Sequence, residues 1–372
     1  MRAIVMGQVG IDKKRYLESV AKLAASRGEV LHVYHVGDRM YAEAPDVHAG
    51  RILDLPLSRL HSLRRSVFKD IISESSDQAN VIVNTHATFR WRHGLFRAFD
   101  FDQIEKFNPD MFVCLVDNVE AIHHRLRSEH TLDATLKDLM VWREEEILAT
   151  ELLALGIGSR KPCFVLPRGR INSTAQTCFR LVCRPRMRKV YLSFPMSHVV
   201  DMPDVLAEID AFRAALAGKF VAFDPGDVDE KMLLESAIKA AKSGQDFIEG
   251  HVAALDGSMV TVKVSVKQVL ETASDIDGQI YARDFQLIDQ ADMIISLIPE
   301  LANGVPGLSS GVERELHHAY EHSKEVYVIW RPRRNPSPFI TETATRVFHS
   351  TEEAVAYFES AGMFVETGLF GN

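Results

Sequence analysis

The chain has 372 residues, enough for two ordinary domains, and its 46% hydrophobic and 25% charged residues exclude a disordered protein. Its four cysteines form no CxxC pair, and no apolar run reaches the roughly 18 residues of a membrane-spanning helix, so we expect a cytoplasmic protein with reduced thiols and no signal peptide. The net charge of −8 is uneven: residues 1–186 hold 27 Lys and Arg against 23 Asp and Glu, whereas the remainder holds 16 against 28, which favours two units and argues against a nucleic-acid partner.

Strands and helices alternate along the first half. Apolar strands are expected at residues 1–6, 30–36, 79–86, 110–117 and 162–167, and amphipathic helices at 13–28, 57–76 and 132–154. Continuous apolar strands that alternate with helices are typical of a parallel sheet covered on both faces.

The alternation starts again after the basic stretch 184–189. Strands are expected at residues 189–195, 219–225, 292–299 and 325–332, helices at 205–218, 311–323 and 351–362, and a helical and irregular stretch at about 228–280. We therefore expect two α/β domains, residues 1–186 and 187–372, each a doubly wound parallel sheet.

The turn between the first strand and the first helix is similar to a phosphate-binding loop. Such a loop reads G-x-x-x-x-G-K-[ST], and Gly7 and Lys13 take the positions of the first glycine and of the phosphate-binding lysine. Gly7, Gly10 and Lys13 are its candidate nucleotide-binding residues. A solvated lysine at the start of a helix is the alternative interpretation of Lys13.

Several segments resemble the archaeal-type adenylate kinases over nearly all of residues 1–170. In the family's order and spacing they are HVGDRMYAEA, LPLSRLHSLRRSVFKDI, VIVNTHA, FNPDMFVCLVDNVEAIHHRLRSE and VWREEEILATELLA. The resemblance implies a P-loop-kinase-like fold, phosphate contact by Lys13, and lid and clamp roles for three arginines, Arg125, Arg127 and Arg143. It also implies ATP or another nucleotide as the ligand.

Three departures from this pattern bear on catalysis. Asp12 places a carboxylate where backbone amides cradle phosphate, Lys14 replaces the hydroxyl that ligates Mg²⁺, and Asn84 stands where the family carries an aspartate. Phosphoryl transfer depends on positioning and on neutralisation by the metal. We therefore expect the first domain to keep the kinase fold without kinase activity, and either to bind a nucleotide or to act as a structural module.

Polar residues of the second half follow predicted parallel strands, where open α/β sheets bind ligands. The candidates are Tyr191 and Ser197 near the first strand, Asp284 and Asp292 before a later strand, and Ser309, Ser310, Gly311 and Glu315 at the start of a helix. Serine hydroxyls and free amides at a helix N-terminus favour phosphate. A carboxylate beside an anchored sugar phosphate can attack the anomeric carbon.

These segments resemble the nucleoside 2-deoxyribosyltransferase family, and more closely its 2'-deoxynucleoside 5'-phosphate N-hydrolase branch, over about residues 188–335. The resemblance implies a Rossmann-type fold and a homodimer or higher oligomer. It assigns Glu315 as nucleophile, Asp284 as acid or base-orienting group, Ser309 as phosphate ligand and Tyr191 as a sugar or nucleophile contact. The branch carries an arginine near Ser197, and we favour a structural capping role for Asp292.

The sequence thus predicts a nucleotide N-glycosidase or deoxyribosyltransferase that uses Glu315 and needs neither metal nor cofactor. A nucleoside monophosphate kinase, a non-catalytic nucleotide sensor and an NAD glycohydrolase are the alternatives. His318 and His322 have the spacing of a metal-binding pair on one helix, but the sequence shows no third ligand, so a solvated helix face is expected there.

Overall fold

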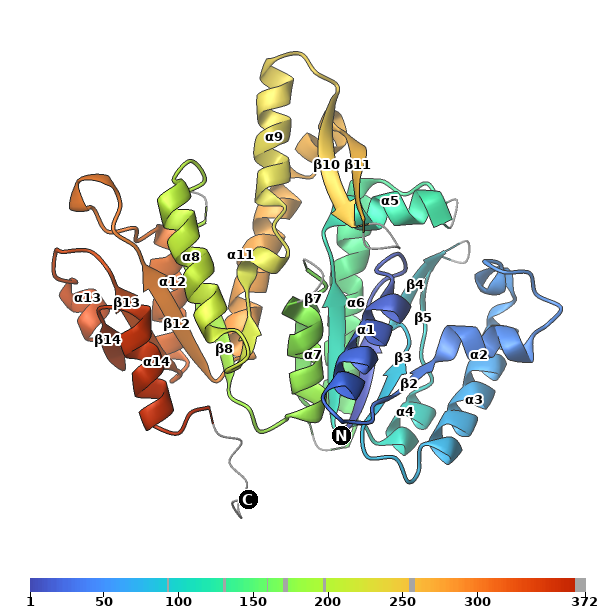
Figure 1. Cartoon of the computed structure of the whole chain (residues 1–372). Coiled ribbons are helices and arrows are strands. Elements are labelled where there is room, and N and C mark those ends of the chain that lie inside the picture. The colour runs from blue at the N-terminus through green and yellow to red at the C-terminus, as the bar shows by residue number, and fades with distance from the viewer. Residues whose placement is uncertain are drawn as a thin grey trace. The chain divides into compact units, whose positions relative to one another are not determined.

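The computed structural model describes residues 1–91, 94–129, 132–158, 160–169, 173–196, 199–253 and 258–364. The chain divides into two compact units, Met1–Cys183 with Val228–Gln279, and Arg184–Asp227 with Ile280–Asn372 (Figure 1). The division at Cys183 lies close to the boundary expected from the sequence. The stretch Val228–Gln279, which we expected in the second domain, packs with the first unit. No described helix is long and apolar enough to cross a membrane.

The first unit is built on a five-stranded sheet whose neighbouring strands all run parallel. The strands are β1 (Arg2–Met6), β2 (His32–His35), β3 (Val81–Asn84), β6 (Met111–Val116) and β7 (Cys163–Pro167). Their order is β2-β3-β1-β6-β7, so β1 occupies the centre of the sheet. Every residue of β6 is buried, as expected for a strand covered on both faces.

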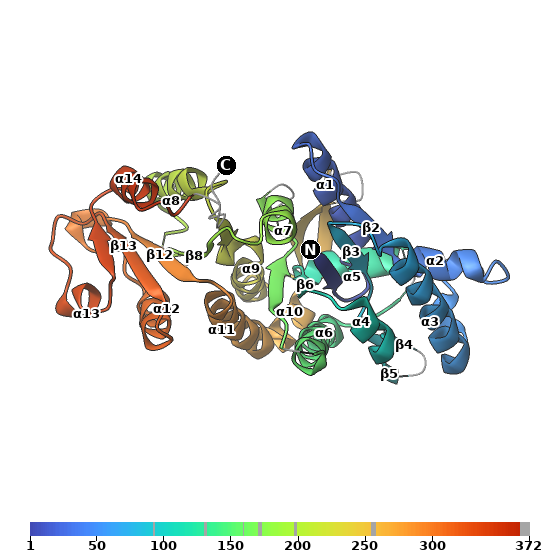
Figure 2. The ribbon, with the colours of Figure 1, turned by 90° about the horizontal axis from the view of Figure 1, so that it is seen from below.

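Helices cover both faces of this sheet (Figure 2). They are α1 (Lys13–Ser26), α2 (Val36–Glu43), α3 (Leu57–Glu74), α4 (Phe101–Phe107), α5 (Val119–Glu129), α6 (Leu136–Gly156) and α7 (Ser173–Cys183), with a 3₁₀ turn at Ile52–Asp54. α1 packs against α7, and α6 packs against β6 and β7. A small antiparallel hairpin, β4 (Thr88–Trp91) and β5 (Gly94–Arg97), follows β3.

The stretch that interrupts the second unit forms an ordered subdomain on the first. It comprises α9 (Lys231–Lys242), β10 (Phe247–Ala253), β11 (Met259–Ser265) and α10 (Val266–Glu271), and it leads into α11 (Ala273–Asp289). β10 and β11 form an antiparallel hairpin that the sequence did not reveal. β10 contacts α5 and α10 contacts α6, so this subdomain lies against the two helices that carry the predicted lid and clamp arginines.

The second unit has its own five-stranded parallel sheet, in the order β14-β13-β12-β8-β9. The strands are β8 (Lys189–Ser193), β9 (Val221–Phe223), β12 (Met293–Ile298), β13 (Glu325–Trp330) and β14 (Arg346–Phe348). The helices are α8 (Pro203–Leu216), α12 (Ser310–Glu321), α13 (Pro338–Thr341) and α14 (Thr351–Ser360), with 3₁₀ turns at Pro225–Asp227 and Ala302–Gly304. α8 and α14 cover one face and α12 the other (Figure 2).

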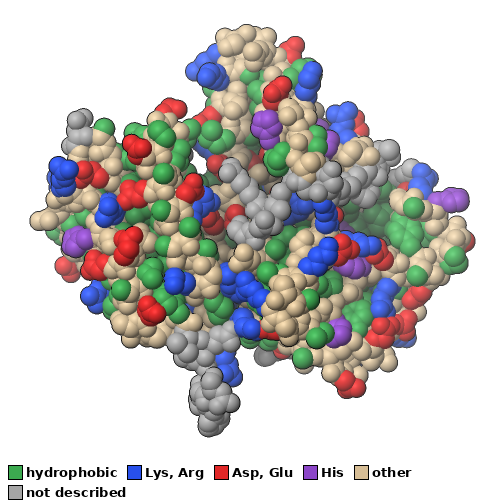
Figure 3. Space-filling model, viewed as in Figure 1, with side chains coloured by type: hydrophobic (Ala, Val, Ile, Leu, Met, Phe, Trp, Pro, Cys, Tyr) green, Lys and Arg blue, Asp and Glu red, His purple; other side chains and the backbone are tan. Residues whose placement is uncertain are grey.

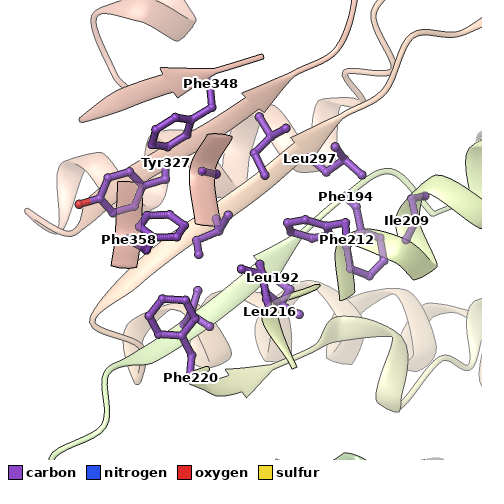
Figure 4. Close-up of a cluster of buried hydrophobic side chains, with 14 of the residues drawn as sticks. Leu192, Phe194, Ile209, Phe212, Leu216, Phe220, Leu297, Tyr327, Phe348 and Phe358 are labelled. Carbon is purple, nitrogen blue, oxygen red and sulfur yellow. The ribbon is translucent and has the colours of Figure 1, made fainter. Parts of the chain in front are cut away.

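The core of the second unit determines which strand residues face α12. Val190 and Leu192 of β8 belong to the hydrophobic cluster that also includes residues of α8 and α14. Figure 4 shows Leu192 within this cluster. Because side chains alternate along a strand, Tyr191 and Ser193 point to the opposite face. The acidic excess of the second half lies outside this core, where Asp and Glu side chains are spread over its visible surface (Figure 3).

Candidate functional site

The loop between β1 and α1 is held in a conformation that requires glycine at two positions. Gly7 has φ +147°, and a Cβ there would lie 2.7 Å from the carbonyl oxygen of Leu115. Gly10 has φ +90°, and a Cβ there would lie 2.9 Å from the side chain of Leu126. Asp12, at the expected second glycine, adopts a left-handed conformation with φ 60°, which glycine would adopt without strain.

Glu146 of α6 anchors this loop and was not singled out from the sequence. Its carboxylate accepts hydrogen bonds from the backbone N–H of Gly7 (3.0 Å) and of Ala87 (2.7 Å), and from the N–H and hydroxyl of Thr88 (2.7 Å each). Its side chain is buried, whereas Glu144 two residues earlier is exposed. The run of three glutamates in α6 looks like a solvated face, and only the packing shows that its last member points inward.

Lys13 points into the first unit at the start of α1. Its Nζ donates to the carbonyl oxygen of Gly7 at 2.5 Å and lies 3.0 Å from Nδ1 of His86. Burial lowers the pKa of Lys13 to about 8, and the nearby Glu146 carboxylate offsets part of that shift. The solvated-lysine alternative is therefore wrong, because the ammonium is buried.

Neither residue at the expected magnesium positions supplies the hydroxyl or the carboxylate of the kinase pattern. Lys14 forms an ion pair with Asp38 at 2.6 Å and can supply no oxygen ligand. Asn84 donates its amide to Nδ1 of His35 at 2.9 Å. The P-loop side of this site thus lacks both groups with which a kinase of this type neutralises phosphate charge through a metal.

A cavity of about 340 Å³ lies beside Lys13. Arg64 of α3 also lines it. This side chain is only 2% exposed, and its Nη1 has no hydrogen-bond partner among the described residues. Burial lowers the pKa of Arg64 to about 10. The remaining walls are partly apolar and aromatic, and include Tyr41, Ile52, Leu53, Phe89 and Trp91.

Two of the three arginines expected to bind phosphate are paired with carboxylates of the chain itself. Arg125 donates to Oδ2 of Asp117 at 2.8 Å and to the carbonyl oxygen of Gly10 at 3.0 Å. Asp117 also lies 3.5 Å from Arg168, which in turn approaches Asp12 at 3.4 Å. Burial raises the pKa of Asp12, and Arg168 opposes that shift.

Arg143 forms the second pair with Glu230, which lies directly before α9 in the Val228–Gln279 subdomain. Its two terminal nitrogens lie 2.6 and 3.0 Å from the two carboxylate oxygens, and both side chains are buried. Glu230 also accepts from the N–H of Val119 at 2.9 Å. Arg127 instead lies at the surface, 3.9 Å from Asp133, and takes no part in this cluster.

The second unit brings three of its predicted residues together beside α12. The hydroxyl of Ser193 donates to Oε2 of Glu315 at 2.6 Å, and the hydroxyl of Ser296 on β12 donates to Ser193 at 3.2 Å. Burial and the negative charge of Asp284 raise the pKa of Glu315 to about 7. Burial, Glu315 and Asp284 raise the pKa of Tyr191 well above its usual value. Ser193 and Ser296 were missed because they stand inside apolar strands.

The other predicted residues make contacts that do not involve Glu315 among the hydrogen bonds of the described residues. Ser309 caps α12, and its hydroxyl accepts from the N–H of Val312 at 3.2 Å, with Ser310 and Gly311 exposed beside it. Asp292 accepts from the N–H of Lys189 at 2.7 Å, at the amino ends of β8 and β12 and therefore opposite the edge at which Ser193 ends β8. This position takes Asp292 out of the site and gives it a structural role. Ser197 lies outside the described residues.

Comparisons with known proteins bear on the first unit. Residues 6–143 match the family model described as an AAA domain. Adenylate kinases of Pyrococcus abyssi (strain GE5 / Orsay) and Pyrococcus furiosus are 28% and 26% identical over 131 residues, or 33% of this chain. The chain spans 64% of the length of these relatives. These similarities confirm the predicted P-loop-kinase-like first unit.

Solved structures with low overall similarity include two kinases. A shikimate kinase from Bacteroides thetaiotaomicron has a TM-score of 0.32 and 10% identity, covering 49% of this chain and 95% of that one. A sugar kinase from Janibacter sp. HTCC2649 has a TM-score of 0.27 and 14% identity, covering 45% and 84%.

Proposed function

We propose that the first unit binds a nucleoside monophosphate in the cavity beside Lys13 and Arg64. The observation that carries this proposal is the pair of buried cations that line one cavity, with Nη1 of Arg64 unpartnered. A buried guanidinium nitrogen without a hydrogen-bond partner is costly, and a phosphate would supply an acceptor oxygen for it. Tyr41, Phe89 and Trp91 offer aromatic surface for a base, and the cavity volume suits a ligand of this size.

Phosphoryl transfer is the activity that the similarity to adenylate kinases favours, and the geometry predicts that it is weak. The carboxylate of Asp12 lies in the loop, Lys14 cannot ligate a metal, and Asp117 and Glu230 already neutralise Arg125 and Arg143. A phosphoryl group in transfer would therefore lie near the negative charge of Asp12, and Arg125 and Arg143 would not be available to neutralise its own charge. Binding without efficient transfer is the function that this arrangement supports.

Calorimetric titration of the full chain with AMP, adenosine, orthophosphate and ATP tests the proposal. AMP should bind, and Arg64→Met should weaken it about 10- to 100-fold, the loss expected for one charge-assisted hydrogen bond. Arg65→Met is the matched control, because Arg65 is the next residue but forms exposed ion pairs with Asp100 and Asp102. No binding of any nucleotide, or equal losses in both variants, would refute it. ADP formation from AMP and ATP at rates typical of kinases, and sensitive to Lys13→Met, would establish the kinase instead.

A second candidate function rests on the Ser193–Glu315 pair of the second unit. Counted along that unit, its strand order is 2-1-3-4-5, which supports a doubly wound, Rossmann-type fold with its ligand site between β8 and β12. Ser193 and Ser296 are paired in register across those two strands, and Glu315 lies beside them. The site is therefore suited to a ligand at the carboxyl ends of the strands.

The chemistry that suits this pair is cleavage of a nucleotide's base–sugar bond. With the proton of this carboxylate pair transferred to Asp284, an ionised Glu315 oxygen would form a bond to C1' while the bond from C1' to the base nitrogen breaks, and Asp284 would give that proton to the departing base. Water would then hydrolyse the ester and release the sugar phosphate. The hydrogen bond from Ser193 would orient the carboxylate, and Ser309 would hold the phosphate at the start of α12.

Chromatographic measurement of the free base released from nucleotides tests this second function. Nucleoside and deoxynucleoside monophosphates, nucleosides and NAD would be incubated with the full chain, with Glu315→Gln and with Glu313→Gln. Glu313 is the control because it lies on the same helix but is exposed. Release that is lost only in Glu315→Gln would support the glycosidase, and an added second base would separate transfer from hydrolysis. No release from any substrate by folded protein would exclude it.

A further inference from the structure

A cluster of possible metal ligands lies on the second unit, away from Glu315. Asp289 at the end of α11, His318 on α12 and His322 directly after the end of α12 each offer one ligand atom, and these atoms lie within 4.8 Å of one another. The two histidines are four residues apart and therefore share one face of α12. The sequence shows the spacing of the two histidines but no third ligand. The contact between α11 and α12 supplies Asp289 as that ligand.

We propose that Asp289, His318 and His322 bind a divalent transition-metal ion such as Zn²⁺. Two imidazoles and one carboxylate are a donor set that zinc accepts in three-residue sites, with water completing the coordination. Oxygen-preferring cations such as Mg²⁺ and Ca²⁺ would bind only one of the three groups well. The proposal does not depend on the function of either unit.

The neighbouring groups leave a ligand atom on each of the three residues. Nδ1 of His322 lies 2.8 Å from the carbonyl oxygen of His318, so Nε2 is the ring nitrogen with which His322 would bind the ion. Nε2 of His318 lies 2.7 Å from Oδ1 of Asp289, so these two ligand atoms are already adjacent. The ring centroids of Phe285 and His318 lie 4.5 Å apart, so Phe285 restricts the orientation of the imidazole. Lys324 is the nearby cation, but its ammonium group donates to the backbone carbonyls of Asp289 and Ala291 rather than to the carboxylate.

The ion would join two helices that also carry the candidate catalytic carboxylates. α11 contributes both Asp284 and Asp289, and α12 contributes both Glu315 and His318. A metal bridge would replace the single contact between His318 and Asp289 with three coordinate bonds, and would hold the two helices in register. The expected role is therefore structural, because the ion's ligands lie on the helices and not at the ends of the strands.

The test is a titration of the metal-free full chain, without an affinity tag, with ZnCl₂. Calorimetry should show one strong site, and zinc should raise the melting temperature. His322→Asn should weaken that site about 100-fold or more, because the loss of even an outer-shell partner costs 10- to 100-fold. Asp289→Asn should have a similar effect. The matched control is His317→Asn, since His317 lies on the same helix but pairs with Glu321.

Substitution of Co²⁺ provides a second, direct measurement. A four-coordinate cobalt site absorbs in the visible region, and this absorption should appear with wild type and His317→Asn but not with His322→Asn. His322 is exposed, so its variant should fold, which circular dichroism would check. Weak binding of several zinc ions that is equal in wild type and His322→Asn would show adventitious surface binding only and would overturn the proposal. No binding to the folded wild type would overturn it as well.

Discussion

The buried ion pair between Arg143 and Glu230 should contribute strongly to the stability of the first unit. Glu230 is 0% exposed and Arg143 is 2% exposed, and the pair fastens the Val228–Gln279 subdomain to α6. Glu230→Ala would leave a buried guanidinium group whose remaining contacts are the carbonyl oxygen of Asp117 and the amide of Gln279. It would also deprive the N–H of Val119 of its acceptor.

The expected loss follows from these contacts. Removing one partner of a buried ion pair costs about 3–5 kcal/mol, and the two contacts that Arg143 keeps place the loss near the lower end, at about 3 kcal/mol. The lost hydrogen bond of Val119 adds about 1 kcal/mol. For a unit of this size, each kcal/mol corresponds to about 2–4 °C in melting temperature, so a shift of roughly 8–16 °C is expected.

Tryptophan fluorescence during urea unfolding would measure the effect. Trp91 and Trp142 belong to the first unit and Trp330 to the second, so a Trp330→Phe background reports on the first unit alone. Lys231→Ala is the control, because the neighbouring ion pair of Lys231 with Asp277 is exposed and should be worth at most about 1 kcal/mol. The double variant Arg143→Met with Glu230→Met should lose less stability than Glu230→Ala.

Either of two results would refute this reasoning. If Glu230→Ala unfolds at the same urea concentration as Lys231→Ala, the subdomain is not fastened by the ion pair. A double variant whose loss of stability equals the sum of the losses of Arg143→Met and Glu230→Met would likewise show that the two charges do not depend on each other.

Three further predictions concern the candidate sites. Asp12→Gly removes a carboxylate from the phosphate loop and relieves a left-handed conformation, so it should tighten orthophosphate or ADP binding about 10-fold by calorimetry, and weaker binding would contradict this. Because the pKa of Lys13 is about 8, AMP affinity should fall as the pH rises from 7 to 9, and Lys13→Met should remove that fall along with most of the affinity. The folded-state pKa of Glu315 is about 7, above its ordinary value of 4.5, so the folded protein binds more protons and loses stability as the pH rises between these values. Glu315→Gln should therefore be more stable than wild type at pH 8, by at most about 3 kcal/mol, and similar to it at pH 4.5. A Glu315→Gln variant that is less stable than wild type at pH 8 would show that burying the ionised carboxylate does not lower the stability of the folded state.

Local patterns determined much of the fold. The continuous apolar runs of β6 and β12 predicted two parallel sheets, because strands covered on both faces need apolar residues throughout. Gly7 and Lys13 marked the phosphate loop through their spacing alone. Glu315 and Asp284 were predicted from motif order, and in the structure burial and the negative charge of Asp284 both raise the pKa of Glu315.

Tertiary structure decided which charges meet. Glu230 lies 87 residues from Arg143 along the chain, and no local pattern links them. Glu146 and Asp289 resemble solvated carboxylates in sequence, because a helix shows only which residues share a face and not what packs against it. The hairpin of β10 and β11 is half exposed and pairs only with itself, so it lacks the apolar run that marks a buried strand. The composition and periodicity of this chain thus specify its layers, whereas the pairing of Arg143 with Glu230 depends on a contact between distant segments.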